Sequence, residues 1–374
     1  MNDTGWREAF LGEICTFKYG KALPQSSRNG GDIPVYGSNG VVGHHDSAIT
    51  TGKTIVIGRK GSFGEVSFSS GPCWPIDTAY FVDETATEQD IKWLSYRLAN
   101  LGLNQLNKAA AVPGLNREDA YRQQLLVPPL PEQRRIAAIL DQAEALRAKR
   151  REALVQLDGL TQAIFIEMFG DPVSNSRGWK VARLGDLVSK LGSGSTPTGG
   201  DAAYKESGIS LIRSLNVHDG EFVYKNLAFI DDVQAGKLSN VVVEEGDVLL
   251  NITGASVARV CSVPKSVLPA RVNQHVMIAR PKSTLNRIYL ERLLLNPQMK
   301  ARLLQVGGAG ATREAITKAQ AAELAIPLPP LDLQGVFAQR VSAVQELQLC
   351  GGQSLEELDA LFASLQHRAF RGEL

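Results

Sequence analysis

Residue types that build metal centres and disulfide frameworks are scarce in this sequence. Among its 374 residues are only 4 cysteines and 5 histidines. Cys15, Cys73, Cys261 and Cys350 stand far apart and form no CxxC pair, so we expect reduced thiols, most of them buried. His44 and His45 are adjacent, and adjacent residues face opposite sides of a strand. We therefore predict no metal site and no metal-ligating residues.

Long apolar runs are also missing. No segment approaches the roughly 18 apolar residues that a membrane helix needs, and the N-terminus lacks the basic-then-apolar pattern of a secretion signal. We therefore expect a cytoplasmic protein with no membrane partner. The formal net charge is only +1, and the one clearly basic segment is 178–328, with a net charge of +5. Any nucleic-acid binding must depend on placed residues rather than on a general positive field.

Motifs of nucleotide and methyl-group chemistry are absent as well. The glycine-rich stretches GSGSTPTGG (192–200) and GGAGAT (307–312) lack the GK(S/T) ending of a phosphate loop. The string NPQM, which begins at Asn296, lacks the second proline and the aromatic residue of an adenine methyltransferase motif. We predict no catalytic and no cofactor-binding residues, and hence a non-catalytic chain.

The sequence contains an internal repeat. GWREAFLGEI (5–14) and GWKVARLGDL (178–187) share five of ten positions at an offset of 173 residues. PPLPEQRRI (128–136) then aligns with PPLDLQGVF (329–337), and LDGLTQAIFIEMF (157–169) with LDALFASLQHRAF (358–370), both at an offset of 201. Such a period is too long for a solenoid. The repeat therefore predicts two tandem units, each a globular domain followed by a tail.

The middle of each unit is typical of short strands separated by glycine and asparagine turns. KTIVIGRKGSFGEVSF and WPIDTAYFV predict strands in the first unit, and GDVLLNITGASVARVCSV and ARVNQHVMIA predict their counterparts in the second. A helix is expected near 88–106 and again near 286–305. The fold class is therefore α+β, with boundaries at 1–128 for the first domain, 129–177 for a central helix, 178–328 for the second domain and 329–374 for a distal helix.

Each tail carries an apolar stripe with steps of three and four residues over about four heptads. An isolated helix would expose such a stripe, so we predict that the two helices pair, antiparallel, as the duplication implies. The predicted seam comprises Ile136, Ile139, Leu146, Arg150, Leu157, Leu160, Ile164, Val341, Val344, Gly351, Leu355, Leu358, Phe362 and Leu365.

Two unusual residues coincide at the middle of this pair. Arg150 and Gly351 are equivalent at the offset of 201, and the second helix carries the string CGGQ at 350–353. One hypothesis is that Gly351 and Gly352 leave room for the stem of Arg150 to cross the seam and reach water. The alternative is a kink or break of the second helix at the two glycines, since each glycine costs about 1 kcal/mol of helix propensity.

Two domains on a shared helical rod are suited to binding a duplex at two separated places. A helix of about 37 residues spans roughly 55 Å, whereas sites one DNA turn apart are separated by about 34–36 Å. Because the two domains differ in their middle parts, we expect an asymmetric, bipartite target.

The sequence resembles the specificity subunits of type I restriction-modification enzymes over essentially its whole length. The resemblance rests on the paired GW…LG(E/D)(I/L) openings, the PPLPEQ helix start, IFIEMFGD at the end of the first helix and AFRGEL at the end of the second. It implies two target-recognition domains that bind double-stranded DNA, and helices that set the spacer and dock two methylation subunits. It also implies S-adenosylmethionine on those partners and a restriction (translocase/nuclease) subunit in the full complex. PPLDLQ and CGGQ depart from the pattern.

Polar and basic residues on loops are the candidate base and phosphate contacts. Lys108 and Arg313 are favoured, because each lies in a small-residue loop before a proline-rich helix start. The candidates of the first domain are Lys18, Lys21, Asn39, Arg59, Lys60, Lys108, Asn116 and Arg117. Those of the second are Ser195, Thr196, Arg213, Asn216, Asn251, Arg259, Asn273, Gln274, Thr312 and Arg313.

Two other functions fit the same pattern. The chain could be a bipartite DNA-recognition module of another nuclease or methylase assembly, or a coiled-coil scaffold that binds proteins only. Salt separates the scaffold from the DNA-binding proteins, since six phosphate contacts weaken binding about a thousandfold between about 50 and 200 mM salt.

Overall fold

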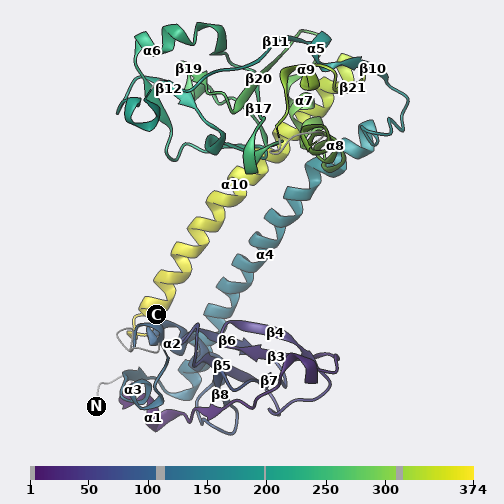
Figure 1. Ribbon diagram of the computed structural model, residues 1–374. Coiled ribbons are helices and arrows are strands. Elements are labelled where there is room, and N and C mark those ends of the chain that lie inside the picture. The colour runs from purple at the N-terminus through teal and green to yellow at the C-terminus, as the bar shows by residue number, and fades with distance from the viewer. Residues whose placement is uncertain (1–4, 107–113, 198, 309–314) are drawn as a thin grey trace. The chain divides into compact units, whose positions relative to one another are not determined.

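The computed structural model describes residues 5–106, 114–197, 199–308 and 315–374 (Figure 1). The chain divides into two compact units. Unit 1 comprises residues 1–152 and 352–374, and unit 2 comprises residues 153–351. Unit 1 is therefore built from two segments far apart in the sequence, with all of unit 2 between them.

Two small sheets form the strand-rich part of unit 1. The first is antiparallel with order β2-β8-β5-β6, from β2 (Lys18–Tyr19), β5 (Thr54–Gly58), β6 (Val66–Ser69) and β8 (Ala79–Asp83). The second has order β4-β3-β7, from β3 (Ile33–Gly37), β4 (Gly40–His45) and β7 (Trp74–Pro75), with β3 and β7 parallel. Helix α2 (Ile91–Asn100) packs on the first sheet, and α3 (Arg117–Tyr121) precedes β9 (Gln124–Val127).

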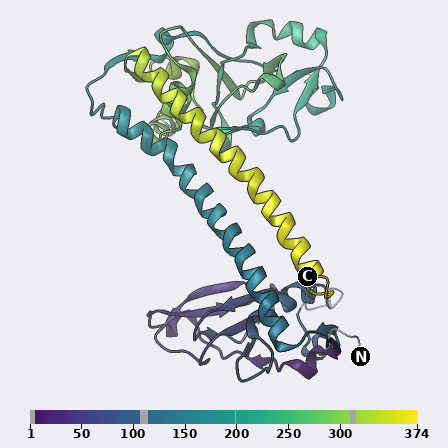
Figure 2. The same cartoon turned by 180° about the vertical axis from the view of Figure 1, so that it is seen from behind.

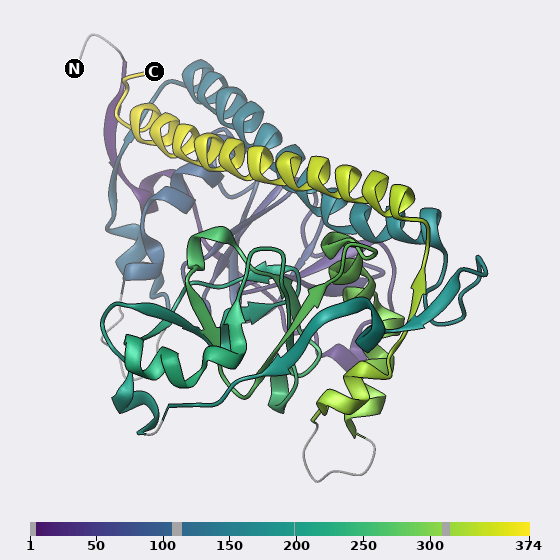
Figure 3. The same ribbon diagram turned by 90° about the horizontal axis from the view of Figure 1, so that it is seen from above.

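Unit 2, whose strands are drawn mainly in green in Figure 3, repeats this plan with longer connections. Its first sheet, antiparallel with order β11-β20-β17-β18, contains β11 (Val188–Ser193), β17 (Val248–Asn251), β18 (Val260–Ser262) and β20 (Val276–Pro281). Its second, with order β15-β12-β19-β16, contains β12 (Ile209–Ile212), β15 (Ala228–Ile230), β16 (Val242–Val243) and β19 (Ala270–Val272). A hairpin joins β13 (Val217–His218) to β14 (Glu221–Phe222). Its helices include α6 (Asp232–Lys237), α7 (Arg287–Leu295), α8 (Pro297–Gly308) and α9 (Lys318–Ala322).

Two of the predicted strands are wrong in extent, for the same reason in both units. WPIDTAYFV forms β7 and β8, and ARVNQHVMIA forms β19 and β20. In each case the chain leaves one sheet and enters the other, because β7 pairs with β3 and β8 with β5, just as β19 pairs with β12 and β20 with β17. A chain that passes from one sheet to another must turn between them. The apolar residues of WPIDTAYFV and ARVNQHVMIA give no sign of such a turn.

The repeated opening has the same structure in both units. β1 (Arg7–Phe10) pairs with β9, and β10 (Lys180–Arg183) pairs with β21 (Ala325–Leu328), both antiparallel. A single helical turn follows each strand, as α1 (Leu11–Ile14) and α5 (Leu184–Leu187), and its first leucine is fully buried. The opening therefore seats each domain on the strand that precedes its long helix, and Leu11 and Leu184 are packing residues.

The tails form two long uninterrupted helices, α4 (Leu130–Phe169) and α10 (Leu331–Ala369), drawn in teal and yellow in Figure 2. Within unit 1, Arg135 contacts Leu374 and Arg147 contacts Asp359, so the helices run antiparallel there. Within unit 2, Asp158 contacts Gln348 and Phe165 packs on Phe337, which gives the same direction. Each unit thus contains the start of one helix and the end of the other.

The seam residues differ in part from the prediction. Ile136, Val341, Val344, Gly351 and Phe362 are buried, and Ile139, Leu157, Ile164, Leu355, Leu358 and Leu365 are half-buried. Leu146, Arg150 and Leu160 are exposed, so their placement in the seam is wrong. The stripe on α4 instead shifts by one residue to Leu140, Arg147, Leu154, Thr161 and Phe165. It includes Arg147 because the guanidinium lies over the ring of Phe362, 4.3 Å from its centre, and pairs with Asp359.

The hypothesis about Arg150 and Gly351 is also wrong. The side chain that lies against Gly351 is that of Leu154, whose Cδ2 would be 2.8 Å from a Cβ at that position. Arg150 is exposed and needs no gap to reach water. A break at the two glycines is wrong too, since α10 continues through residues 350–353, whereas a kink there stays a prediction.

Candidate functional site

Unit 1 has an open groove where β5 ends and the segment leading into α3 begins. The cavity measures about 460 Å³ and is lined by Tyr19, Arg59, Lys60, Tyr80 and residues 114–118. We call this the first groove. Three of the lining side chains are cationic, Arg59, Lys60 and Arg117, against one carboxylate, Glu118. The first groove is therefore suited to an anionic or acceptor-rich ligand.

Arginines and tyrosines interleave in the first groove. The guanidinium carbon of Arg59 lies 5.1 Å from the centre of the Tyr19 ring and 5.8 Å from that of Tyr80. Arg117 lies 5.5 Å from the Tyr19 ring and 5.7 Å from the Tyr121 ring. Tyr19 and Tyr80 meet edge to face with centroids 5.1 Å apart. Planar guanidinium groups stack well on aromatic faces, so the tyrosines fix the direction of both arginines.

Two of these tyrosines are anchored as neutral phenols. Burial raises the pKa of Tyr80, and the neighbouring Tyr19 adds to the rise. Burial also raises the pKa of Tyr121. Tyr80 donates a hydrogen bond to the Leu115 carbonyl at 3.3 Å, and the Tyr121 hydroxyl accepts one from the Phe17 amide at 2.7 Å. Backbone groups thus hold both rings, Tyr80 in the lining of the first groove and Tyr121 against Arg117.

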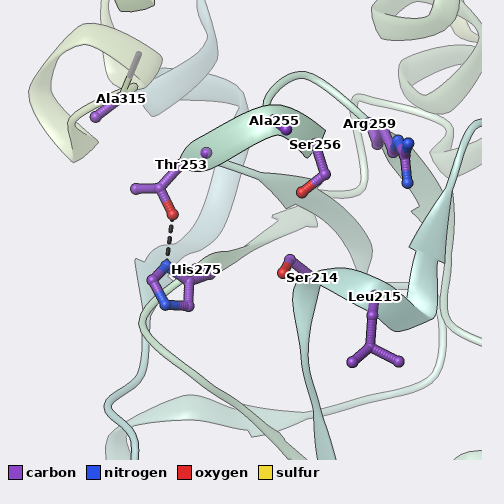
Figure 4. A pocket seen from close by; sticks show the side chains of 9 residues that line it. Ser214, Leu215, Thr253, Ala255, Ser256, Arg259, His275 and Ala315 are labelled. Carbon is purple, nitrogen blue, oxygen red and sulfur yellow. Dashed lines mark hydrogen bonds between the residues drawn. The ribbon is translucent and has the colours of Figure 1, made fainter. Parts of the chain in front are cut away.

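Unit 2 has a groove in the corresponding place, shown in Figure 4. This second groove measures about 740 Å³ and is lined by Ser214, Leu215, residues 253–256, Arg259, His275 and Ala315. The Thr253 hydroxyl and the Nδ1 of His275 lie 2.5 Å apart, joined by the dashed line in Figure 4. Gln274 contacts the other ring nitrogen of His275 at 3.1 Å. Small hydroxyl groups and one imidazole take the place of the stacked arginines of the first groove, and among the described residues Arg259 is the one arginine in this lining.

Backbone contacts show that the two grooves are equivalent. Leu115 donates to the Arg59 carbonyl at 2.9 Å, and Ile316 donates to the Ile252 carbonyl at 2.8 Å. One residue further along, Lys60 forms a β-bridge with Gly114 and Thr253 forms one with Ala315. The N-caps that follow, Asn116 of α3 and Thr317 of α9, also correspond. The frame is shared, and the side chains that line it differ.

The structure brings some of the predicted contacts together. Arg59, Lys60, Asn116 and Arg117 line the first groove, and Arg259 lines the second. Thr196 and Gln274 are hydrogen-bonded to each other and lie beside the second groove through His275. Lys108, Thr312 and Arg313 lie outside the described residues.

Three predicted contacts are wrong, because their side chains are buried. Asn216 and Asn251 are fully buried and Asn273 is nearly so. The Asn216 amide donates to the Val223 carbonyl at 2.8 Å, and the Asn251 amide donates to the Ser214 carbonyl at 2.9 Å. Asn273 accepts the His275 amide at 3.0 Å. These amides satisfy backbone groups of the loops around the second groove and cannot reach a ligand.

The remaining candidates lie outside the grooves as the structure defines them. Lys18 is paired with Asp83 at 2.8 Å, and Lys21 lies over the Trp74 ring at 5.8 Å. Asn39 is exposed in the turn between β3 and β4, and Ser195 is exposed after β11. Arg213 lies over the Tyr204 ring at 5.0 Å and donates to the Asn226 carbonyl at 2.6 Å.

Several groove residues were missed from the sequence. Tyr19, Tyr80, Thr253, Ser256 and His275 line the two grooves without having been singled out. Tyr19 and His275 directly adjoin predicted residues, Lys18 and Gln274. Aromatic and imidazole side chains beside the basic loops are the sequence signal that points to Tyr19 and His275.

Comparison with known proteins identifies the family of the chain. The family described as type I restriction modification DNA specificity domain matches residues 3–156 and again residues 176–359. The chain belongs to this family. The double match also corresponds to the duplication, since each half of the chain carries one copy of the domain.

Curated relatives in the family include two specificity subunits. The type I restriction enzyme MjaVIII specificity subunit of Methanocaldococcus jannaschii is 20% identical over 269 residues, 68% of this chain and 62% of the relative. The EcoprrI specificity subunit of Escherichia coli is 29% identical over 142 residues, 36% of this chain and 35% of the relative. The chain therefore spans less than two thirds of the length of either relative.

Solved structures share the fold. The S subunit of a type I restriction-modification system from M. genitalium matches with a TM-score of 0.63 at 15% identity, over 99% of this chain and 97% of that one. A chain from a study of complex assembly and conformational transition of the type I R-M system gives a TM-score of 0.62 at 20% identity, over 99% and 98%. The predicted fold class, two mixed α/β domains with two long helices, is confirmed.

The described residues contain neither a metal-site cluster nor a membrane-spanning helix. Within the described ranges, no group of three or more His, Cys, Asp or Glu side chains could hold a metal ion. No helix in the same part of the chain has the length and apolarity needed to cross a membrane.

Proposed function

We propose that this family member is the DNA sequence-specificity subunit of a type I restriction-modification complex, and that each groove binds one half of an asymmetric, bipartite target in double-stranded DNA. The observation that carries the proposal is the pair of equivalent grooves with different linings. A shared backbone frame positions each domain in the same way, while different side chains at the same positions discriminate different bases. An arginine–tyrosine lining and a hydroxyl–imidazole lining have different hydrogen-bonding capacities.

The proposal assigns chemistry to partner subunits. Two methylation subunits would bind S-adenosylmethionine and transfer its methyl group, a restriction subunit would complete the complex, and this chain itself would be non-catalytic. Its contribution is to hold the two half-sites at a fixed separation, with α4 and α10 setting the length of the non-specific spacer.

Exposed leucines support two equal docking sites on the long helices. Leu146 on α4 and Leu347 on α10 are equivalent at the offset of 201 and are 55% and 57% exposed. Leu160 and Leu361 are equivalent in the same way and are 39% and 50% exposed. Unit 1 therefore carries Leu146 and Leu361, and unit 2 carries Leu347 and Leu160. A duplicated apolar pair is suited to binding two copies of the same partner.

Methylome sequencing of a host with and without this chain tests the proposal. The expected result is a gapped, asymmetric, adenine-methylated motif that disappears when the chain is deleted and returns when it is restored. A deletion strain that keeps its full set of methylated motifs would count against the proposal.

A binding experiment in vitro separates the proposal from a protein scaffold. The chain is purified with its methylation subunits and titrated with a duplex that contains the motif and with a scrambled duplex. We expect preference for the motif, and affinity that falls about a thousandfold between about 50 and 200 mM salt if six phosphates are contacted. Equal affinity for both duplexes at every salt concentration would exclude sequence recognition.

A further inference from the structure

The first groove contains an arrangement that the second lacks. Two guanidinium groups contact the Tyr19 ring, that of Arg59 at 5.1 Å and that of Arg117 at 5.5 Å from its centre. In unit 2 the paired residues at the corresponding sheet position are Ser193 and Met277, where unit 1 has Tyr19 and Tyr80. Arg59 itself corresponds to Ile252. The stacked arginines therefore belong to one domain and not to the shared frame.

Arg59 is held at several points. Its Nη1 donates to the Asp77 carbonyl at 3.0 Å, and this carbonyl is the one acceptor of the guanidinium among the described residues. The rings of Tyr19 and Tyr80 lie beside the guanidinium. Tyr80 is buried and Tyr19 is 54% exposed, so the stack reaches from the core to the mouth of the groove. The donors not used by Asp77 are fixed in direction before any ligand arrives, which lowers the entropy lost on binding.

Two like charges on one ring repel each other unless a ligand with acceptors lies between or beside them. Glu118 lies 3.6 Å from Arg117 and offsets the charge of that arginine, whereas no carboxylate is paired with Arg59 among the described residues. Of the two arginines stacked on Tyr19, Arg59 is therefore the one whose charge no carboxylate of the described residues offsets and whose remaining N–H donors can bind a ligand.

Guanine presents two acceptors, O6 and N7, side by side in the major groove, and the fork of an arginine fits both at once. We propose that Arg59 recognises a guanine in the half-site bound by unit 1, with Tyr19 and Tyr80 as positioning residues. This rests on the proposed function and adds to it the identity of one base and of the residue that selects it. The neighbouring Lys60, exposed and unstacked, contacts phosphate and carries no sequence information.

The test uses the chain in complex with its methylation subunits and duplexes that carry the methylome-defined motif. Each base pair of the motif is replaced in turn, and affinities are measured for wild type, Arg59→Lys, Tyr19→Ala and Lys60→Ala. A further duplex carries 7-deazaguanine, which lacks the N7 acceptor, at each guanine in turn. Arg59→Lys keeps the charge but loses the planar fork, and thermal unfolding of each variant confirms that the fold is retained.

We expect wild type to discriminate one guanine by roughly 5- to 150-fold and to lose affinity when that base is 7-deazaguanine. Arg59→Lys should lose this discrimination at that position alone and become indifferent to 7-deazaguanine. Tyr19→Ala should reduce discrimination at the same position. Lys60→Ala should weaken binding to all duplexes equally and lower the salt dependence by about one phosphate contact.

Two results would overturn the inference while leaving the proposed function intact. One is wild-type specificity that Arg59→Lys retains at every position, and the other is a motif with no guanine in the half-site that responds to variants of unit 1. If wild type shows no preference for any duplex, the proposed function itself fails, and the guanine assignment fails with it.

Discussion

Among single residues, two equivalent glutamines perform the same structural role in the two proline-rich helix starts. Gln133 and Gln334 are almost completely buried near the start of α4 and α10. Gln133 donates to the Pro128 carbonyl at 2.9 Å and accepts the Asp90 amide at 2.8 Å. Gln334 makes the same two bonds, with Pro329 and Asn286, at 2.8 Å each. PPLPEQ and PPLDLQ differ in sequence, but the glutamine they share ties each long helix to the N-cap of α2 or α7.

The adjacent glycines of α10 give the first prediction. A Cβ at Gly352 would meet nothing within 4 Å, whereas a Cβ at Gly351 would lie 2.8 Å from the Leu154 side chain. We expect Gly352→Ala to raise the free energy of unfolding by up to about 1 kcal/mol, because alanine is the better helix former. Gly351→Ala should gain less, since Leu154 must move aside. Urea unfolding followed by circular dichroism measures both.

A matched control isolates the contact. In the Gly351→Ala, Leu154→Ala double variant the clash is removed, so the effect of Gly351→Ala relative to Leu154→Ala alone should approach that of Gly352→Ala. Equal stabilisation by the two single variants would show that Leu154 does not press on Gly351.

At the scale of elements, each long helix has apolar residues that lie in the seam and others that stay exposed. The leucines that do not lie in the seam, Leu146 and Leu361 in unit 1 and Leu347 and Leu160 in unit 2, recur at equivalent positions. If two methylation subunits dock on these leucines, as proposed, replacing Leu146 and Leu361 together by lysine should remove one of them, because two charges would enter an apolar contact. The mass of the purified complex, measured by sedimentation, gives the number of copies.

Val155 provides the control for this experiment. It is an exposed apolar residue on α4, but its equivalent on α10 is Glu356, so it is not part of a duplicated apolar pair. Val155→Lys should leave two copies bound. A complex that keeps both copies after replacement of Leu146 and Leu361 would show that the partner docks elsewhere.

The elements also show what sequence patterns can predict. The duplication and the two helices followed from aligned letters and periodicity, which local sequence determines. Three seam residues of α4 are predicted wrongly because Arg147 and Thr161 are polar and break the apolar stripe, yet Arg147 packs through its stem and its planar head on Phe362. The buried asparagines and the arginine–tyrosine stack could not be predicted. Their roles depend on neighbours that only the folded sheets bring together, as Tyr19 meets Arg59 across β2, β8 and β5.

For the whole molecule, the proposed spacer function makes a quantitative prediction. The boundary between the units falls inside both helices, at residues 152–153 and 351–352. Seven residues inserted at each place preserve the heptad phase and add about 10 Å of helix. At 3.4 Å per base pair this equals about three base pairs. The methylated motif should keep both half-sites, and its gap should lengthen by about that amount.

An insertion in one helix only is the control. It shifts α4 against α10 by a heptad on one side and mismatches their ends, so we expect loss of methylation rather than a new gap. If the double insertion leaves the gap unchanged, the helices do not set the spacer.

The construction of unit 1 from both ends of the sequence has a consequence for biosynthesis. Ile136, Leu140 and Ala143 of α4 are buried together with Phe362, Ala369 and Phe370 of α10. A ribosome must therefore translate all of unit 2, roughly 200 residues, before the covering segment emerges, a wait of about 10–40 s at ordinary elongation rates. During that interval the nascent first domain presents an uncovered apolar stripe, and such surfaces make nascent chains prone to aggregation. The first domain to be synthesised is thus the last to be completed.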